Sequence, residues 1–265
     1  MKITIIGTGN IGSAVAIGLS KSNIIKAEEI TCSDLKQENL DKILSIEKHF
    51  RTTVNACDAI KDADIIIIAV KPWMVEKSIN QIKEYLNPAK QMVISFAAGI
   101  DFTKMNRYFE INGSNDKTPA LFRVTPNIAI EVRSSLTFIA SYKASKEQED
   151  CVINLFNQLG SAILIEEGLM AAGTALASCG IAFALRYIRA ATEGGVEMGF
   201  YPEQARQIVV QTVKGAVDLL NAHNTNPETE IDRVTTPGGI TIRGLNKMEE
   251  EGFSSAIIKG LKASR

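Results

Sequence analysis

One short segment near the start of the chain constrains its fold more than any other feature. Residues 2–12, KITIIGTGNIG, join a β-branched run to a glycine-rich turn, and residues 10–22 then repeat apolar side chains at helical spacing. A G-x-G-x-x-G sequence between a strand and a helix is typical of the first βα turn of a dinucleotide-binding sheet. The sequence therefore predicts a doubly wound parallel sheet that begins at these residues.

Each glycine of this motif has a separate physical task. Gly7 permits the tight turn, Gly9 lets a pyrophosphate approach the backbone, and Gly12 lets the helix pack closely on the strand. Asp34 follows about twenty residues later, at the end of the expected second strand, where a carboxylate can accept hydrogen bonds from an adenosine ribose. That position favours NAD, whereas Lys36 could attract the 2′-phosphate of NADP. The expected cofactor is therefore NADPH or NADH.

Strand and helix patterns alternate through the first two-thirds of the chain. Strands are expected at residues 2–7, 28–34, 51–54, 64–72, 91–99 and 120–126. Helices are expected between them at residues 10–22, 37–47, 57–63, 75–86 and 101–109. Two more strands, 135–143 and 161–167, flank a helix at 145–159, and only helical periodicity follows residue 168. This order predicts an α/β fold with a Rossmann-type domain, residues 1–165, followed by an all-α dimerisation domain, residues 166–265.

The ends of two expected strands extend the candidate cofactor site. AVKP (69–72) and FAAG (96–99) end the fourth and fifth strands, at the carboxyl edge along which a dinucleotide runs. Lys71 could equally be a solvated loop lysine. With the glycine loop, the expected cofactor-binding residues are Gly7, Thr8, Gly9, Asn10, Ile11, Gly12, Asp34, Ala69, Val70, Lys71, Pro72, Ala97, Ala98 and Gly99.

The helical region begins with an alanine-rich stretch, residues 170–199, that is apolar on most faces. A helix of this kind must be buried on most faces, and in a small domain that burial usually requires a partner subunit. We therefore expect a homodimer or a higher oligomer of dimers. We expect no membrane partner, because no stretch contains the roughly 20 apolar residues that a membrane-spanning helix requires.

Composition limits the kinds of partner, metal site and chemistry that the chain can have. The formal net charge of −1 gives no electrostatic reason to expect nucleic acid. Four scattered cysteines indicate reduced thiols and a cytoplasmic protein. Neither histidine lies in a motif, and no cluster has metal-ligand spacing, so the expected metal is none. The chemistry should need little acid–base help, and reduction of a protonated imine fits, because that group is already activated towards hydride.

The loop DRVTTPGGITIRGL, residues 232–245, joins two expected helices, 228–234 and 241–253. Proline and glycine punctuate helices and threonine caps them, so the loop could be a simple connector. It could also bind an anion, because a helix N-terminus offers unpaired N–H groups and paired glycines allow close approach. The residues alone leave both interpretations open.

Five motifs taken in order, IIGTGNIGSA, AVKP, FAAG, VTPN and DRVTTPGGITIRGLNKMEEEGF, resemble those of pyrroline-5-carboxylate reductase over nearly the whole chain. This family reduces the cyclic imine 1-pyrroline-5-carboxylate to L-proline with NAD(P)H. The resemblance implies that the loop holds the substrate carboxylate and that Thr241, the catalytic candidate, lies near the ring nitrogen. It adds Asn127 to the cofactor residues. The substrate-binding residues that it implies are Thr236, Pro237, Gly238, Gly239, Ile240 and Cys179.

Two segments depart from the family pattern. Where the family usually has M-P-N-T-P, this chain has TPNIA, with Ile128 and Ala129 in place of the second Thr-Pro. Where the family has G-S-G-P-A-Y, this chain has SCGIAF, with Cys179, Ile181 and Phe183 as the changes. Two alternatives therefore stay open: a paralogous reductase for another small imine or keto acid, and a non-catalytic dinucleotide-sensing protein.

Overall fold

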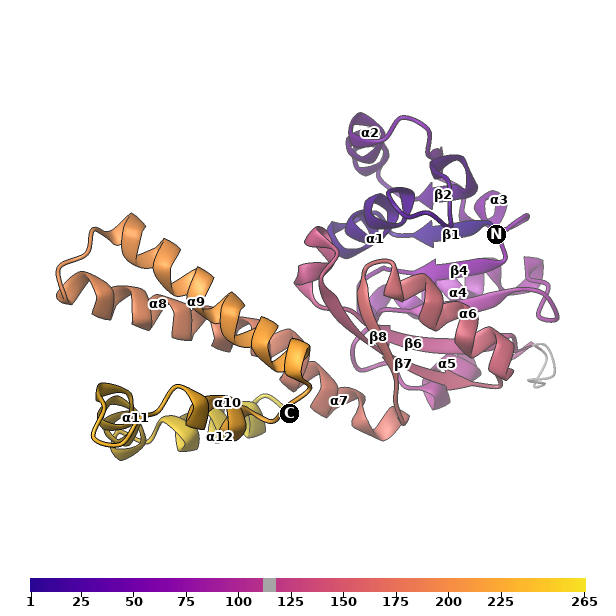
Figure 1. Cartoon of the computed structure of the whole chain (residues 1–265). Helices are drawn as coiled ribbons and strands as arrows, with labels where there is room; N and C mark the ends of the chain where they lie inside the picture. Colours follow the sequence, from indigo (N-terminus) through magenta and orange to yellow (C-terminus); the bar gives the residue numbers. More distant parts are fainter. Residues whose placement is uncertain (112–117) are drawn as a thin grey trace. The chain divides into compact units, whose positions relative to one another are not determined.

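The chain forms two compact units, Met1–Gly173 and Thr174–Arg265 (Figure 1). The computed structural model describes residues 1–111 and 118–265. The first unit contains the strands, and the second is entirely helical in its regular elements. Each unit has its own candidate site, so each is described by itself.

The first unit is built on an eight-stranded sheet with the strand order β3-β2-β1-β4-β5-β6-β7-β8. Only β6 and β7 pair antiparallel; every other neighbouring pair is parallel. The strands are β1 (Ile3–Ile6), β2 (Ile30–Ser33), β3 (Arg51–Thr53), β4 (Ile65–Ile68), β5 (Met92–Ser95), β6 (Ala120–Thr125), β7 (Ser135–Tyr142) and β8 (Gly160–Leu164). The strand order reverses between β1 and β4, which opens a crevice at the carboxyl ends of these two strands.

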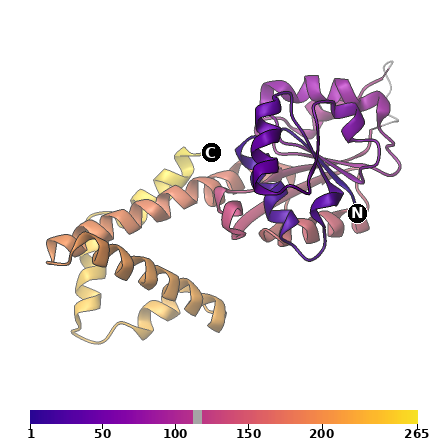
Figure 2. The ribbon, with the colours of Figure 1, turned by 90° about the horizontal axis from the view of Figure 1, so that it is seen from above.

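Helices cover both faces of this sheet (Figure 2). On one face α1 lies beside α6, because a Cβ at Gly18 of α1 would stand 2.5 Å from Leu159, just after α6. On the other face α4 contacts both α3 and α5. The helices of this unit are α1 (Asn10–Ser20), α2 (Gln37–Ile46), α3 (Ala56–Ala59), α4 (Val75–Ile82), α5 (Phe102–Tyr108), α6 (Lys146–Asn157) and α7 (Met170–Gly173). The expected doubly wound sheet is therefore confirmed.

The core follows from this double coverage. All four isoleucines of β4, residues 65–68, are fully buried, although their side chains alternate between the two faces of the sheet. A strand buried on both faces needs a continuous apolar run, and that is the pattern by which the sequence predicts it. The strand ends earlier than the expected residue 72, because Pro72 opens a short 3₁₀ helix, Pro72–Met74, that leads into α4.

A partly buried ion pair fastens the segment that follows β8. Glu167 accepts hydrogen bonds from the backbone N–H of Phe102, at 2.7 Å, and from the guanidinium of Arg123, at 2.8 Å. Phe102 begins α5 and Arg123 lies in β6, so one carboxylate joins three elements of the first unit. The Arg123 side chain is only 13% exposed, so it depends on Glu167 for compensation of its charge.

The second unit contains two long helices packed side by side, α8 (Gly180–Glu197) and α9 (Pro202–His223) (Figure 1). Gly195 of α8 permits a close crossing, because a Cβ there would lie 3.0 Å from that of Ala205. A π-helical segment, Thr174–Cys179, precedes α8. The remaining helices are α10 (Pro227–Arg233), α11 (Ile240–Glu250) and α12 (Phe253–Ala263). The expected helix 241–253 corresponds to α11, which ends earlier, at Glu250, because Gly252 has a φ of 82° in the left-handed region.

The continuous helical segment Glu167–Glu197 is largely uncovered in the single chain. It is 31 residues long, and its most apolar 18-residue window has a mean hydropathy of 1.7 with only 17% of the window buried. The expectation that no stretch reaches the length and hydropathy of a membrane span is therefore wrong for this segment. Alanine and glycine are its commonest residues, and a helix that packs on another protein surface can have the same composition.

Candidate functional site

The glycine loop between β1 and α1 has the geometry of a phosphate-binding turn. Gly7 has a φ of 98°, and its N–H donates to the carbonyl of Ser33 at 2.7 Å, which ties the loop to β2. A Cβ at Gly12 would lie 2.0 Å from the Gly7 carbonyl oxygen, so only glycine fits there. A Cβ at Gly9 would meet nothing within 4 Å. The loop is therefore packed at Gly12 and open at Gly9, where a ligand can approach.

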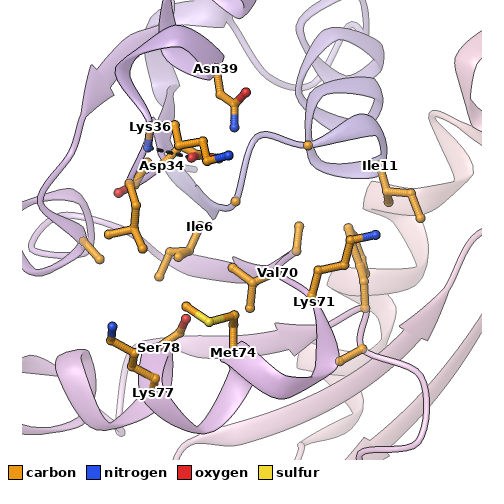
Figure 3. Close-up of a pocket in the computed structure, with 18 of the residues that line it drawn as sticks. Ile6, Ile11, Asp34, Lys36, Asn39, Val70, Lys71, Met74, Lys77 and Ser78 are labelled. Atoms are coloured by element: carbon orange, nitrogen blue, oxygen red, sulfur yellow. Dashed lines mark hydrogen bonds between the residues drawn. The ribbon is translucent and has the colours of Figure 1, made fainter.

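A cavity of about 760 Å³ opens beside this loop, at the carboxyl ends of β1, β2, β4 and β5 (Figure 3). Its size suits a bound small molecule or cofactor. Most of the expected cofactor residues line it. Those that do are Gly7, Gly9, Asn10, Ile11, Asp34, Ala69, Val70, Lys71, Pro72, Ala97 and Ala98.

Four expected cofactor residues do not line the cavity. Thr8 and Gly12 belong to the glycine loop but are buried within the protein. Gly99 lies beyond β5 with a φ of 75°, and its carbonyl accepts from Lys104 at 3.2 Å. Asn127 is buried, and its side chain accepts from the N–H of Ala129 at 3.1 Å, which caps a short helix. A cofactor role for these four stays a prediction.

One face of α4 supplies cavity residues that the sequence-based reasoning missed. Met74, Lys77, Ser78 and Gln81 all line the cavity. Their spacing of i, i+3, i+4 and i+7 places them along one stripe of the helix. The signal was present in the sequence, but recognising it requires the knowledge that α4 follows the loop at the carboxyl end of β4. Asn39 of α2, Val54 after β3 and Ala56 at the start of α3 also line the cavity.

Asp34 is the carboxylate of this cavity, and it is strongly hydrogen-bonded. Its Oδ2 accepts from the N–H of Thr8 at 2.8 Å and from the Thr8 hydroxyl at 3.1 Å, and its Oδ1 accepts from the N–H of Lys36 at 2.9 Å. Partial burial raises the pKa of Asp34, but hydrogen bonds from Lys36, Thr8 and Asn39 lower it by more, so the net pKa lies below its ordinary value. Asp34 is therefore ionised at neutral pH.

The features of the cavity fit a dinucleotide. Helix α1 begins at Gly9 with no side-chain cap and no acidic residue in its first turn, so its N-terminal N–H groups can receive a pyrophosphate. Three lysines line the cavity against the one carboxylate, which favours an anionic ligand: Lys36, Lys71 and Lys77. Across residues 1–111 and 118–265, no group of three or more His, Cys, Asp or Glu side chains is placed to hold a metal ion.

The second candidate site is the loop before α11, in the helical unit. Gly238 has a φ of 71°, and the N–H of Gly239 donates to the carbonyl of Thr236 at 2.9 Å, which closes a tight turn. A Cβ at Gly239 would lie 2.5 Å from the Thr236 hydroxyl oxygen, so that hydroxyl stands beside the start of α11. Helix α11 has no side-chain cap and no acidic residue in its first turn. The arrangement leaves its N–H groups available to an anion.

The other expected substrate residues lie in the same unit. Pro237 and Ile240 are exposed, and the half-buried Thr241 occupies the first turn of α11. Cys179 ends the π-helical segment, and π-helical turns occur often at functional sites. The cavity beside the glycine loop and the loop before α11 thus belong to different compact units.

Both units match known families. Residues 167–265 match the family described as pyrroline-5-carboxylate reductase dimerisation. Residues 2–99 match the family described as NADP oxidoreductase, coenzyme F420-dependent. The first match includes the loop before α11, and the second includes the glycine loop and most of the cavity.

Relatives align along nearly the whole chain. Pyrroline-5-carboxylate reductase 2 of Dictyostelium discoideum is 38% identical over 277 residues, covering 99% of this chain and 90% of that protein. Pyrroline-5-carboxylate reductase 1 of the same organism is 37% identical, and the alignment spans about half of its length, 48%, and 99% of this chain. The crystal structure of Plasmodium falciparum pyrroline carboxylate reductase with NADP bound is 26% identical, with a TM-score of 0.84, covering 100% of this chain and 95% of that one.

Proposed function

The chain belongs to the pyrroline-5-carboxylate reductase family, and we propose that it reduces 1-pyrroline-5-carboxylate to L-proline with NAD(P)H, as the last step of proline biosynthesis. One observation carries the proposal: the 38% identity to a reductase of that name extends over 99% of this chain and 90% of that relative. The identity therefore includes the dinucleotide cavity and the loop before α11 together, and not only the common nucleotide-binding fold.

The cofactor site that we propose is the cavity beside the glycine loop. A reduced nicotinamide cofactor supplies the hydride. The chain itself holds the pyrophosphate at Gly9 and the N-terminus of α1, and directs the dinucleotide along Lys71 and Ala98 at the ends of β4 and β5. Residues 1–165 form this cofactor domain in our proposal, and residues 166–265 form the substrate and dimerisation domain.

The loop before α11 receives the substrate carboxylate in this proposal. The uncapped N–H groups of α11 and the Thr236 hydroxyl supply hydrogen-bond donors to the anion. Cys179 contributes to the wall of the same pocket. As the C=N bond is reduced, the ring nitrogen gains the electron pair of that bond, and the Thr241 hydroxyl donates a hydrogen bond to it. The donors thus hold the imine in place while charge shifts within the ring.

The oligomer that we infer is a homodimer, or a larger assembly of dimers, formed through the helical unit. Its support is the uncovered apolar surface of Glu167–Glu197, where Leu176 is 61% and Leu185 is 58% exposed in the single chain. A partner copy would cover this surface without a membrane, and we place the enzyme in the cytoplasm with no nucleic-acid partner. Light scattering should detect a dimer or larger species, and a stable active monomer would contradict the inference.

A second candidate function rests on the changes in the substrate segments. Ile181 and Phe183 on α8, with Ile128 and Ala129 after β6, replace residues that the family usually keeps. A reductase for another small imine or keto acid would retain the cofactor cavity and carboxylate loop while changing these four residues. A dinucleotide-sensing protein would bind the cofactor without turnover.

Cofactor oxidation with synthetic pyrroline-5-carboxylate separates these functions. We expect fast turnover, and rescue of a proline auxotroph by the expressed chain. Turnover only with other imines or keto acids would favour the paralogous reductase, and cofactor binding with no turnover on any of them would favour the sensor.

A matched pair of variants then tests the carboxylate loop. Thr236→Val removes the hydroxyl beside the start of α11, and loss of a hydrogen bond to a charged group should lower kcat/KM about ten- to hundredfold. Thr235→Val is the control, because its hydroxyl already donates to the carbonyl of Ile231 at 2.7 Å. We expect the control to change the melting temperature rather than KM. Equal effects on KM from the two variants would remove Thr236 from the site.

A further inference from the structure

The hydrogen bonds of Asp34 leave little of this carboxylate for a ligand. A carboxylate offers about four acceptor positions. Three are used by backbone and hydroxyl donors of Thr8 and Lys36, and the Asn39 side chain lies beside the same carboxylate (Figure 3). A ribose 2′-hydroxyl could bind Asp34 only by displacing one of these contacts. The contacts instead join the glycine loop to the end of β2, so Asp34 holds the loop in place.

Two lysines of the same cavity have side chains without such partners. Within the part of the chain that the structure describes, the ammonium groups of Lys36 and Lys77 make no hydrogen bond or ion pair. Both line the cavity. Figure 3 shows Lys36 and Asn39 beside Asp34, Lys77 on α4 across the cavity from them, and Lys71 beside Ile11. The cavity thus offers two free cationic donors, Lys36 beside Asp34 and Lys77 across from it, and one acceptor that is largely occupied.

We propose that Asp34 is a positioning residue for the glycine loop, and that Lys36 and Lys77 make this cavity select a dinucleotide bearing a 2′-phosphate over one with a free 2′-hydroxyl. A 2′-hydroxyl needs a free acceptor, whereas a phosphate monoester needs donors and positive charge. Asp34 is the one carboxylate of the cavity lining, and the acids of α2, Glu38 and Asp41, are exposed and lie outside that lining. This inference refines the proposed function, because it names the form of the cofactor that the same site prefers.

Binding of two nucleotide fragments tests the selectivity without any turnover. Adenosine 2′,5′-bisphosphate and 5′-AMP differ only in the 2′-phosphate, and isothermal titration calorimetry on the full chain gives the affinity for each. We expect the bisphosphate to bind at least about tenfold more tightly, the effect of one charge-assisted hydrogen bond. Equal binding of the two fragments would overturn the inference alone, whereas binding of neither would overturn the dinucleotide site and the proposed function with it.

Lysine variants identify the source of the selectivity. Lys36→Gln and Lys77→Gln should each lower the preference for the bisphosphate over 5′-AMP several-fold, because each removes a free cationic donor from the cavity lining. Lys42→Gln is the matched control, since Lys42 lies exposed on α2 outside the cavity lining. If Lys42→Gln lowered the selectivity as much as the other two, general charge rather than these residues would be responsible, and the assignment would fail.

Asp34→Asn separates positioning from ribose recognition. A positioning role predicts that both fragments lose affinity by the same factor, because the glycine loop that serves both is loosened. A ribose-reading role predicts that 5′-AMP alone loses affinity. Thr8→Ala provides an independent readout, since it removes a hydroxyl donor to Asp34 without touching the carboxylate. It should lower both affinities together, and a loss confined to 5′-AMP in either variant would overturn the positioning role.

Discussion

Gly12→Ala tests the close packing on which the dinucleotide cavity depends. The added methyl would lie 2.0 Å from the Gly7 carbonyl oxygen, and real Cβ contacts essentially never fall below 3.0 Å, so the backbone must move by at least 1 Å. The obstacle is a backbone atom and cannot rotate away. Overpacking of this kind costs about 1–3 kcal/mol, and the better helix propensity of alanine returns less than about 1 kcal/mol.

The expected result is a net destabilisation of about 1–2 kcal/mol with a loss of dinucleotide affinity of about tenfold or more. A shift of 1 Å in the loop misplaces the N–H groups that receive the pyrophosphate. Differential scanning fluorimetry of the free protein should show a melting temperature lower by roughly 2–8 °C. Titration calorimetry with NADPH measures the affinity.

Gly9→Ala is the control, being the same chemical change in the same loop. A Cβ there meets nothing within 4 Å, so the free protein should lose less than about 1 kcal/mol. The methyl nevertheless occupies the open side where the pyrophosphate approaches, so affinity should still fall. The reasoning would be refuted if Gly12→Ala kept the melting temperature and the affinity of the unaltered protein, or if Gly9→Ala were the less stable of the two.

Three further outcomes follow from contacts described above. Thr241→Ala should lower turnover by roughly three- to thirtyfold with dinucleotide affinity unchanged; unchanged turnover with a lower melting temperature would make this residue a helix cap instead. Glu167→Ala should destabilise the chain by about 1–3 kcal/mol in chemical denaturation, because it leaves Arg123 and the N–H of Phe102 without their acceptor; an unchanged denaturation midpoint would contradict this. Because the pKa of Asp34 is lowered in the folded chain, the stability it contributes is complete above about pH 4 and is lost as pH falls through that lowered value. The difference in melting temperature between the unaltered chain and Asp34→Asn should therefore be constant from about pH 5 to 8 and shrink in more acid buffer; a constant difference at every pH would contradict the shift.

The sheet and the position of the cavity could be predicted because their determinants are local. The glycine spacing from Gly7 to Gly12 and the apolar run of β4 carry physical requirements that only a few backbone arrangements satisfy. The stop at Pro72 and the break at Gly252 were equally visible in the sequence. Apolar periodicity continues across both positions, so periodicity alone predicts longer elements than the structure has.

The properties of individual side chains in the cavity could not be predicted in the same way. A carboxylate at the end of the second strand indicates ribose binding by position, but position does not say how many donors already surround it. Thr8 and Lys36 engage Asp34 through a tertiary arrangement of two loops that sequence spacing does not specify. The same applies to Asn127, whose contact with Ala129 is that of a cap. Sequence motifs thus indicate where chemistry lies more reliably than what each polar group does there.

The uncovered segment Glu167–Glu197 has a consequence for the fate of newly made chains. Each newly made chain exposes this apolar surface until another copy covers it. Before that, the surface can bind an unrelated protein or leave the chain open to proteolysis. The lifetime of the chain then depends on its concentration in the cell, because at low expression each chain stays unassembled for longer. A cell carrying two versions of the gene would also form mixed oligomers, in which a defective subunit takes the position of a functional one. Changes confined to the dinucleotide cavity leave assembly intact and should accordingly act dominantly, whereas changes on this surface that prevent assembly should behave as simple losses.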